Sequence, residues 1–137
     1  MSFRDISRIA GSAMTAQTVR LNTVASNLAN ADSAAGSEAA AFRGRKPVFA
    51  SQMQGSGEWQ GVGVRVLDVV KSDKPVRKVN DPSNPLADQD GNVYFGNVNA
   101  VEEMTDMMAA SRAFQTNVEV MARVKVMQQD LLKLGEG

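Results

Sequence analysis

The 137-residue chain has no cysteine and no histidine. Their absence excludes disulfide bonds, thiolate nucleophiles, imidazole general bases and the histidine and cysteine ligands that commonly hold zinc and haem. Aromatic residues are also scarce, with one Trp, one Tyr and five Phe, so a compact core anchored by aromatic side chains is not expected. We therefore expect no enzymatic activity, no cofactor and no small-molecule substrate.

The chain has neither an excess of one charge nor a long run of apolar residues. Fifteen basic and fifteen acidic residues give a net charge of zero, so a nucleic-acid partner is not expected. No apolar run is long enough to span a membrane. The first residues, "MSFRDISRIAGSAMTAQ", lack the basic start, apolar run and small-residue cleavage site of a secretory signal. Taken alone, this absence predicts a cytoplasmic protein.

Apolar residues recur at intervals of three and four near the N-terminus, which predicts a helix over residues 2–30 within a first segment, 1–31. The seam that they form consists of Phe3, Ser7, Ala10, Met14, Gln17, Leu21, Val24, Leu28 and Ala31, widened by Ile6 and Ala13. Such spacing is typical of coiled coils, although two polar residues make the seam imperfect. Residues 32–41 are rich in Ala, Ser and Gly, and we expect a flexible linker there.

Residues 42–98 differ in character and predict a small β-rich segment with irregular connections. The runs "FRGRKPVFAS" and "VGVRVLDVVKSD" are rich in β-branched and apolar residues, as strands are. Three of the four prolines come next, in "KPVRKVNDPSNP". The Asp-Gly pair in "DQDGNV" then predicts a turn that leads into another short strand.

Two motifs in this segment have alternative interpretations. "DQDGNV" invites comparison with a calcium loop, but with Gly91 as the loop glycine the last ligand position falls on Asn97, where glutamate is required. "GSGEWQGVGVR" is not followed by a helix, so it is not a phosphate-binding loop. Trp59 within it is either a contact anchor for a partner or a cap on a small β core.

Residues 99–134 predict a second long helix within a last segment, 99–137, with Asn99 as its N-cap and Gly135 as its end. One apolar stripe consists of Ala110, Ala113, Asn117, Val120, Val124, Met127, Leu131 and Leu134. A second stripe, on an adjacent face, consists of Met104, Met107, Ser111, Phe114, Val118 and Met121. A helix with two apolar faces needs partners on two sides. The N-terminal helix can cover one face, and we expect another chain to cover the other.

Three asparagines lie in the helical segments, although asparagine is a poor helix former. Asn30 either caps its helix or forms hydrogen bonds that set the register between packed helices. Asn27 and Asn117 either face solvent or form hydrogen bonds that set the register between packed helices, as a buried asparagine does in coiled coils. For Asn117, which lies on an apolar stripe, the register role is favoured.

The two ends of the chain resemble a known family. "AGSAMTAQTVRLNTVASNLANADS" is similar to the N-terminal signature of bacterial flagellar rod and hook proteins. "NVNAVEEMTDMMAASRAFQTNVEVMARVKVMQQDLLKLG" resembles the closing segment of the same family. The motif "NDPSNPLADQDGNV" and the short length indicate a proximal rod subunit. The resemblance implies a mainly α fold with a small β-rich insert, in which the terminal helices pair in a coiled-coil-like arrangement and residues 42–98 lie outside.

The resemblance also implies a structural function. The chain would assemble with copies of itself and with other proximal and distal rod subunits into the tubular drive shaft that transmits torque from motor to hook. Its further partners would be the basal adaptor at the export gate and the flagellar type III export apparatus. Its location would then be the periplasm-spanning rod, reached without a cleaved signal peptide.

We predict that the apolar faces of both helices form the assembly interface. Its candidate residues are Ile6, Ala10, Met14, Leu21, Val24, Asn27, Leu28, Asn30, Met104, Met107, Phe114, Asn117, Val118, Val120, Met121, Val124, Met127, Leu131 and Leu134. The alternative function is a soluble adaptor, built as a helical hairpin with a β insert. Such an adaptor would satisfy one apolar stripe internally and form a monomer or a small closed oligomer.

Overall fold

The computed structural model describes residues 2–54 and 61–137. Its elements are α1 (Phe3–Ala29), β1 (Ala34–Ala35), β2 (Arg45–Gln54), β3 (Gly61–Lys71), β4 (Arg77–Asn80), β5 (Asn92–Phe95) and α2 (Ala100–Gly135). The predicted combination of N- and C-terminal helices with a small β region between them is confirmed. Trp59 lies outside the described residues, so its two interpretations stay open.

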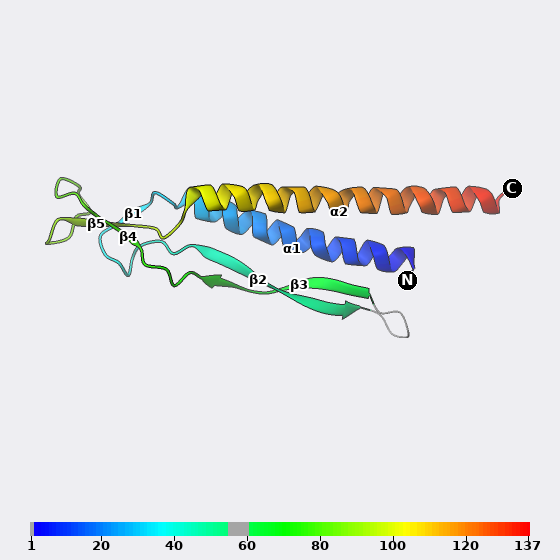
Figure 1. Cartoon of the computed structure of the whole chain (residues 1–137), viewed down its shortest axis with the longest axis horizontal. Helices are drawn as coiled ribbons and strands as arrows, with labels where there is room; N and C mark the ends of the chain where they lie inside the picture. Colours follow the sequence, from blue (N-terminus) through cyan, green and yellow to red (C-terminus); the bar gives the residue numbers. More distant parts are fainter. Residues whose placement is uncertain (1, 55–60) are drawn as a thin grey trace.

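The molecule is elongated, with α1 as its middle layer (Figure 1). α2 runs antiparallel to α1 along one side, and the hairpin of β2 and β3 lies along another side of α1. A small sheet of order β1-β5-β4 extends beyond one end of the helices. The two termini lie at the other end, where α2 projects past the start of α1.

Side-chain caps determine where α1 begins and ends. At its start, the Ser2 hydroxyl accepts a hydrogen bond from the Asp5 N–H at 3.2 Å, and the Ser2 N–H donates to the Asp5 carboxylate at 2.9 Å. This reciprocal capping box satisfies backbone groups that the first helical turn leaves free. At its end, Asn30 is the C-cap and donates from its side chain to the Ser26 carbonyl at 2.9 Å. Of the two interpretations of Asn30, the capping role is confirmed.

α2 is capped at its start as predicted. The Asn99 side-chain oxygen accepts hydrogen bonds from the N–H groups of Val101 and Glu102, at 3.0 and 3.3 Å. The predicted end at Gly135 is wrong by one residue, because this glycine is still helical and Glu136 is the C-cap. A last helical glycine with no αL residue after it leaves the end of α2 without a Schellman stop.

The core between the layers is built from small side chains. The buried apolar residues of the helices are Ala10, Ala16, Val24, Ala110 and Val124. Alanine lets two backbones approach closely, but each alanine removes little apolar surface from water. In the small sheet Val93 is fully buried, and it is the largest apolar side chain buried to that degree in the described part of the chain. The fold therefore rests on a thin core.

Part of the segment expected to be a linker has regular structure. Ala34 and Ala35 form β1, which pairs antiparallel with Phe95 and Tyr94 of β5. Ala41 at the end of the segment is buried. The Ala-, Ser- and Gly-rich composition of this segment did not indicate the pairing, because a two-residue strand is held by backbone hydrogen bonds rather than by its side chains.

The hairpin of β2 and β3 confirms the two strands predicted from β-branched runs. Its antiparallel pairing runs from Arg45 opposite Lys71 to Gln54 opposite Gly61, with a shift in register between Val48 and Phe49. An irregularity of this kind bends and twists a strand. One edge of the hairpin contacts α1, since the Val64 N–H donates to the Ser12 hydroxyl at 3.1 Å.

The turn predicted at "DQDGNV" lies in the connection from β4 to β5 and is confirmed. Gly91 has a positive φ of 76°, which favours glycine. The Asp88 carboxylate accepts from the N–H groups of Asn92 and Asp90, at 2.8 and 3.0 Å, and from the Tyr94 hydroxyl at 3.1 Å. These bonds, led by that of the Asn92 N–H, hold the pKa of Asp88 below its usual value.

Gly91→Ala is expected to destabilise the chain. An added Cβ would lie 2.9 Å from Pro82 Cγ in a strained backbone conformation, so we expect a loss of about 1 kcal/mol or more in the free energy of unfolding. Gly11→Ala is the matched control, because its Cβ meets nothing within 4 Å inside α1 and removing a helical glycine stabilises by roughly 0.5–1 kcal/mol. Urea unfolding followed by circular dichroism measures both, and equal effects would contradict the proposed strain.

The pKa of Tyr94 is expected to be above its usual value near 10. The hydrogen bond to Asp88 is the main cause, followed by partial burial and by the Asp88 charge, since all three disfavour the tyrosinate. Tyr94 is the single tyrosine, so its alkaline titration can be followed directly by tyrosinate absorbance. Asp88→Ala should lower the midpoint toward the usual value, whereas Asp90→Ala should leave most of the shift. An unchanged midpoint in Asp88→Ala would show that the hydrogen bond is absent in solution.

Candidate assembly interface

The candidate interface residues fall into three groups in the structure. Four are buried inside the chain: Ala10, Val24, Asn27 and Val124. Nine are half-buried: Ile6, Met14, Leu21, Leu28, Asn30, Met107, Phe114, Asn117 and Val120. Six are exposed: Met104, Val118, Met121, Met127, Leu131 and Leu134. All the exposed candidates lie on α2, so α2 holds the apolar surface that another chain can reach.

Polar groups accompany the packing of α1 against α2. Arg20 and Asp106 form an ion pair at 2.6 Å, with side chains 26% and 41% exposed. Because solvent screens a pair this accessible, its contribution is of the order of 0.2–1 kcal/mol. Gln17, one of the polar interruptions of the predicted seam, has its side-chain oxygen buried without a hydrogen-bond partner in the described part of the chain. Such a group costs about 1–3 kcal/mol, so the helix pairing is not optimised for stability.

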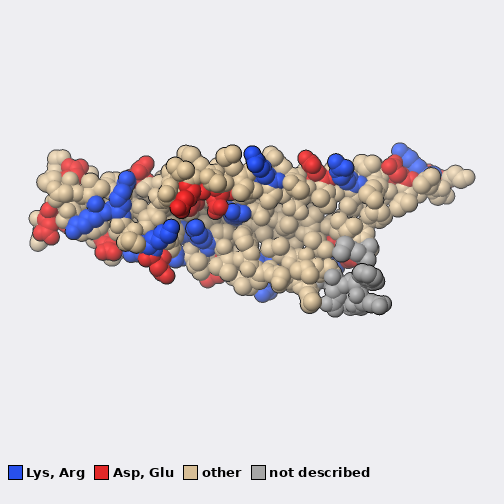
Figure 2. Space-filling view, in the orientation of Figure 1, with Lys and Arg blue, Asp and Glu red and all other residues tan. Residues whose placement is uncertain are grey.

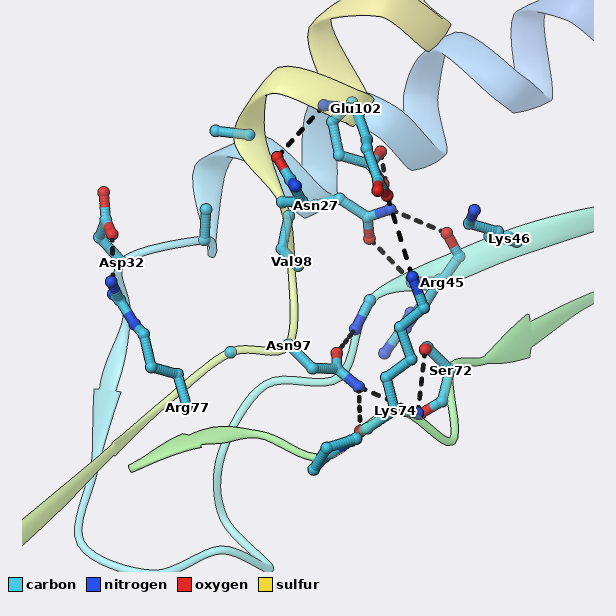
Figure 3. A pocket seen from close by; sticks show the side chains of 17 residues that line it. Asn27, Asp32, Arg45, Lys46, Ser72, Lys74, Arg77, Asn97, Val98 and Glu102 are labelled. Atoms are coloured by element: carbon cyan, nitrogen blue, oxygen red, sulfur yellow. Dashed lines mark hydrogen bonds and ion pairs between the residues drawn. The ribbon is translucent and has the colours of Figure 1, made fainter. Parts of the chain in front are cut away.

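The Asn27 side chain joins three elements at the end of the helix pair (Figure 3). Its Nδ2 donates to the Arg45 carbonyl of β2 at 2.8 Å and to the Glu103 carboxylate of α2 at 3.0 Å. Its Oδ1 accepts from the Arg45 N–H at 2.9 Å. Asn27 is 1% exposed and Glu103 is 8% exposed. The amide therefore fixes where α1, β2 and α2 meet.

The register role favoured for Asn117 is not seen between α1 and α2 in the described part of the chain. Its Nδ2 donates to the carbonyl of Ala113 at 2.8 Å, one turn earlier in its own helix. A side chain that bonds back to the i−4 carbonyl carries no information about the neighbouring helix. Asn27 makes the contact between helices instead.

Asn97, which occupies the last ligand position of the excluded calcium loop, is a second connecting amide. Its Oδ1 accepts from the Gly44 N–H at 2.7 Å, and its Nδ2 donates to the Lys74 carbonyl at 2.7 Å. It thereby ties the segment before α2 to the start of β2 and to the loop after β3. Its place just before the helix cap is the signal that sequence reasoning could have used.

A hollow of about 580 Å³ lies between the two connecting amides. Its charged lining side chains are Asp32, Arg45, Lys46, Lys74, Arg77, Glu102 and Glu103. Figure 3 shows Asp32 and Arg77 turned toward each other, and they form an ion pair at 3.3 Å. Because both signs of charge occur around the hollow, it is not adapted to a ligand of one charge.

The side of α2 that is turned away from α1 is apolar and exposed. Val101, Met104, Met108 and Val118 are 72, 56, 59 and 43% exposed. Figure 2 shows charged side chains gathered from the small sheet to the start of α2, with separate charged side chains along the edge formed by α2 and a mostly uncharged surface between them. Sequence reasoning found two of these four residues. Val101 and Met108 were missed because the stripes were drawn through neighbouring positions.

The end of α2 is a second exposed apolar surface. Met127, Leu131, Leu132 and Leu134 are 54 to 78% exposed, because α2 projects past the start of α1 (Figure 1). Several large apolar side chains exposed together mark a site of interaction with another macromolecule. Neither described helix is apolar enough over a sufficient length to cross a membrane.

Two family models match the chain. Residues 8–36 match flagella basal body rod protein, and residues 89–134 match the C-terminal region of flagellar basal body rod FlgEFG protein. A protein of Escherichia coli O157:H7, named flagellar basal-body rod protein FlgC, is 46% identical over 99% of this chain and 100% of its own. A protein of the same name from Salmonella typhimurium is 45% identical over 99% of this chain and 100% of its own length. Another from Bacillus subtilis is 33% identical over 93% of this chain and 95% of its own length. The chain belongs to the FlgC family of flagellar basal-body rod proteins.

Membership in this family confirms the resemblance seen in the sequence. The family is one of structural rod proteins and not of enzymes. The exposed apolar surfaces of α2 are therefore surfaces of a protein that assembles with other rod components. The adaptor alternative is set aside.

Asn27→Ala is expected to destabilise the chain strongly. It leaves the buried Glu103 carboxylate and the Arg45 backbone without their partners, at a cost of about 2–4 kcal/mol in the free energy of unfolding. Asn117→Ala is the matched control, since it removes only a bond within α2 and should change stability by less than about 1 kcal/mol. Denaturant unfolding of the two variants tests this, and a similar loss in both would refute the special role of Asn27.

Proposed function

We propose that the chain is a subunit of the flagellar proximal rod. It assembles with copies of itself and with other proximal and distal rod subunits into the tubular shaft that transmits torque from motor to hook. The observation that carries this proposal is the exposed apolar surface along α2 and at its projecting end. A shaft under torque needs many contacts in parallel, and each large apolar side chain that becomes buried contributes about 1.5–3 kcal/mol.

In this proposal residues 1–31 and 99–137 form the axial core, and 32–41 connect it to residues 42–98 on the outside. The two helices of the core pair in a coiled-coil-like arrangement. Heptad spacing of the buried residues supports this pairing, because Ala10 and Val24 on α1, and Ala110 and Val124 on α2, lie two heptads apart. The candidate residues that are exposed on α2 form the part of the interface that meets other subunits.

The chain reaches the periplasm-spanning rod through the flagellar type III export apparatus without a cleaved signal peptide, and the basal adaptor at the export gate is one of its neighbours. The small side chains of the core support passage as an unfolded chain. A thin core gives up little stabilisation on unfolding, so an export machine needs little work to keep the chain extended.

Leu131→Asp and Leu134→Asp are expected to abolish swimming. Both side chains are more than half exposed, so the isolated chain should keep its helical circular dichroism, while a buried charge in the assembled rod prevents assembly. Met107 and Phe114 are less suitable positions, because they are half-buried. The measurement is motility in a strain that lacks its own copy of the gene.

Gln129→Asp is the matched control for these variants. It adds the same charge at an exposed polar position of the same helix end and should leave motility intact. Swimming of the leucine variants at the control rate would contradict the assembly role of this surface.

A further inference from the structure

The small sheet is joined to the rest of the molecule by short connections that meet beside the start of α2 (Figure 1). They lead from α1 to β1, from β1 to β2, from β3 to β4 and from β5 to α2, and consist of residues 30–33, 36–44, 72–76 and 96–99. The small sheet and the hairpin are separate sheets. Contacts between these connections therefore decide whether the small sheet can move relative to the helices.

The Asn97 side chain bonds the β5–α2 connection to two of the others (Figure 3). Its Oδ1 accepts from the Gly44 N–H at 2.7 Å, and its Nδ2 donates to the carbonyls of Lys74 and Ser72, at 2.7 and 3.3 Å. A carboxamide is planar and carries an acceptor and two donors. One half-buried side chain thus fixes the relative positions of the connections before β2, after β3 and before α2.

A second side chain holds the same two carbonyls from another direction. The Arg43 guanidinium donates to the carbonyls of Lys74 and Ser72, at 3.2 and 3.5 Å. The backbones of these two connections also bond directly, since the Ser72 N–H donates to the Gly44 carbonyl at 2.7 Å. We call Arg43, Gly44, Ser72, Lys74 and Asn97 the clamp.

The backbone beside the clamp is closely packed. Gly96 is buried, and a Cβ added to it would lie 3.2 Å from the Phe42 carbonyl oxygen and 3.3 Å from that of Asn30. The β5–α2 connection therefore lies directly against the connections that precede β1 and β2. A close-packed junction leaves little room for a change of angle.

The ion pair near the clamp contributes much less to its rigidity. Lys74 Nζ lies 4.0 Å from the Glu102 carboxylate, and the two side chains are 68% and 58% exposed. Water screens a pair this accessible. The hydrogen bonds of the clamp, above all those of Asn97, are consequently the contacts that resist movement at the junction.

We propose that the clamp holds the small sheet at a fixed angle to the helices, and that Asn97 is the positioning residue on which this angle depends. The chain is then one rigid body, and loss of the Asn97 amide converts the junction into a hinge. In the rod, a fixed angle brings the small sheet to the same place in every subunit. This consequence rests on the proposed function, whereas the clamp itself does not.

Spin-label distances across the junction test the clamp, and labels can be placed freely because the chain has no cysteine of its own. The full chain carries Val79→Cys on β4, which is 39% exposed, and Gln115→Cys at an exposed position of α2. Pulsed electron paramagnetic resonance should give a single narrow distance distribution. With Asn97→Ala added, the distribution should become about twice as wide, because a region that loses its tertiary hydrogen bonds opens locally.

Two controls show whether the change arises at the junction. Asn84→Ala also removes an amide, but one that accepts from the Leu86 N–H within the β4–β5 loop at 3.0 Å, so the width should stay unchanged. A second pair of labels, Thr15→Cys on α1 and Val101→Cys on α2, occupies exposed helical positions. Its distribution should be equally narrow with and without Asn97→Ala.

Each result supports or overturns the clamp. A broad distribution in the chain that keeps Asn97, or equal widths with and without Asn97→Ala, would overturn it. If Asn97→Ala lost its helical circular dichroism, Arg43→Ala would replace it, since it removes the other bonds to the same two carbonyls. A wider distribution in that variant supports the clamp, and an unchanged one overturns it. Motility plays no part in this measurement, so failure of the clamp leaves the rod function intact, and failure of the rod function leaves the clamp intact.

Discussion

The buried amide of Asn27 is the interaction on which the arrangement of the other elements depends. It joins the last turn of α1 to the backbone of Arg45 and to the carboxylate of Glu103. A buried carboxylate and a buried backbone pair are costly without partners, so few other arrangements satisfy all three groups. Because α2 and the hairpin both start at this point, their positions along α1 follow from it.

The rest of the chain adds specificity more than stability. The helix seam is built from alanines and valines, one buried oxygen in it lacks a partner in the described part of the chain, and its ion pair is accessible to solvent. The large apolar side chains, leucines and methionines above all, are instead exposed on α2. The apolar surface that would stabilise a self-sufficient domain is thus left accessible to other subunits. This distribution suits a protein whose stable form is an assembly.

The helices, the cap at the start of α2 and the two hairpin strands were predictable, since periodicity and capping residues are local properties. The role of Asn27 was not, because Asn27 and Asn117 occupy similar positions in helical patterns and differ only in what lies opposite. Packing of the hairpin on α1 also escaped prediction. It includes a hydrogen bond from the backbone of Val64 to the hydroxyl of Ser12, and such a contact leaves no hydrophobic pattern. Of the exposed residues on the outer side of α2, Met104 and Val118 were predicted, whereas Val101 and Met108 were not. Apolar periodicity indicates which side of a helix is apolar, but it does not determine how wide that apolar surface is.

The layer order also decides what kind of assembly is possible. A closed dimer with twofold symmetry needs one surface that is complementary to itself. Here the outer layers are unlike, one a methionine-rich helix face and the other a β hairpin that exposes valines. Unlike layers on one subunit therefore favour growth over closure, and the projecting end of α2 adds contacts along the direction of the helices.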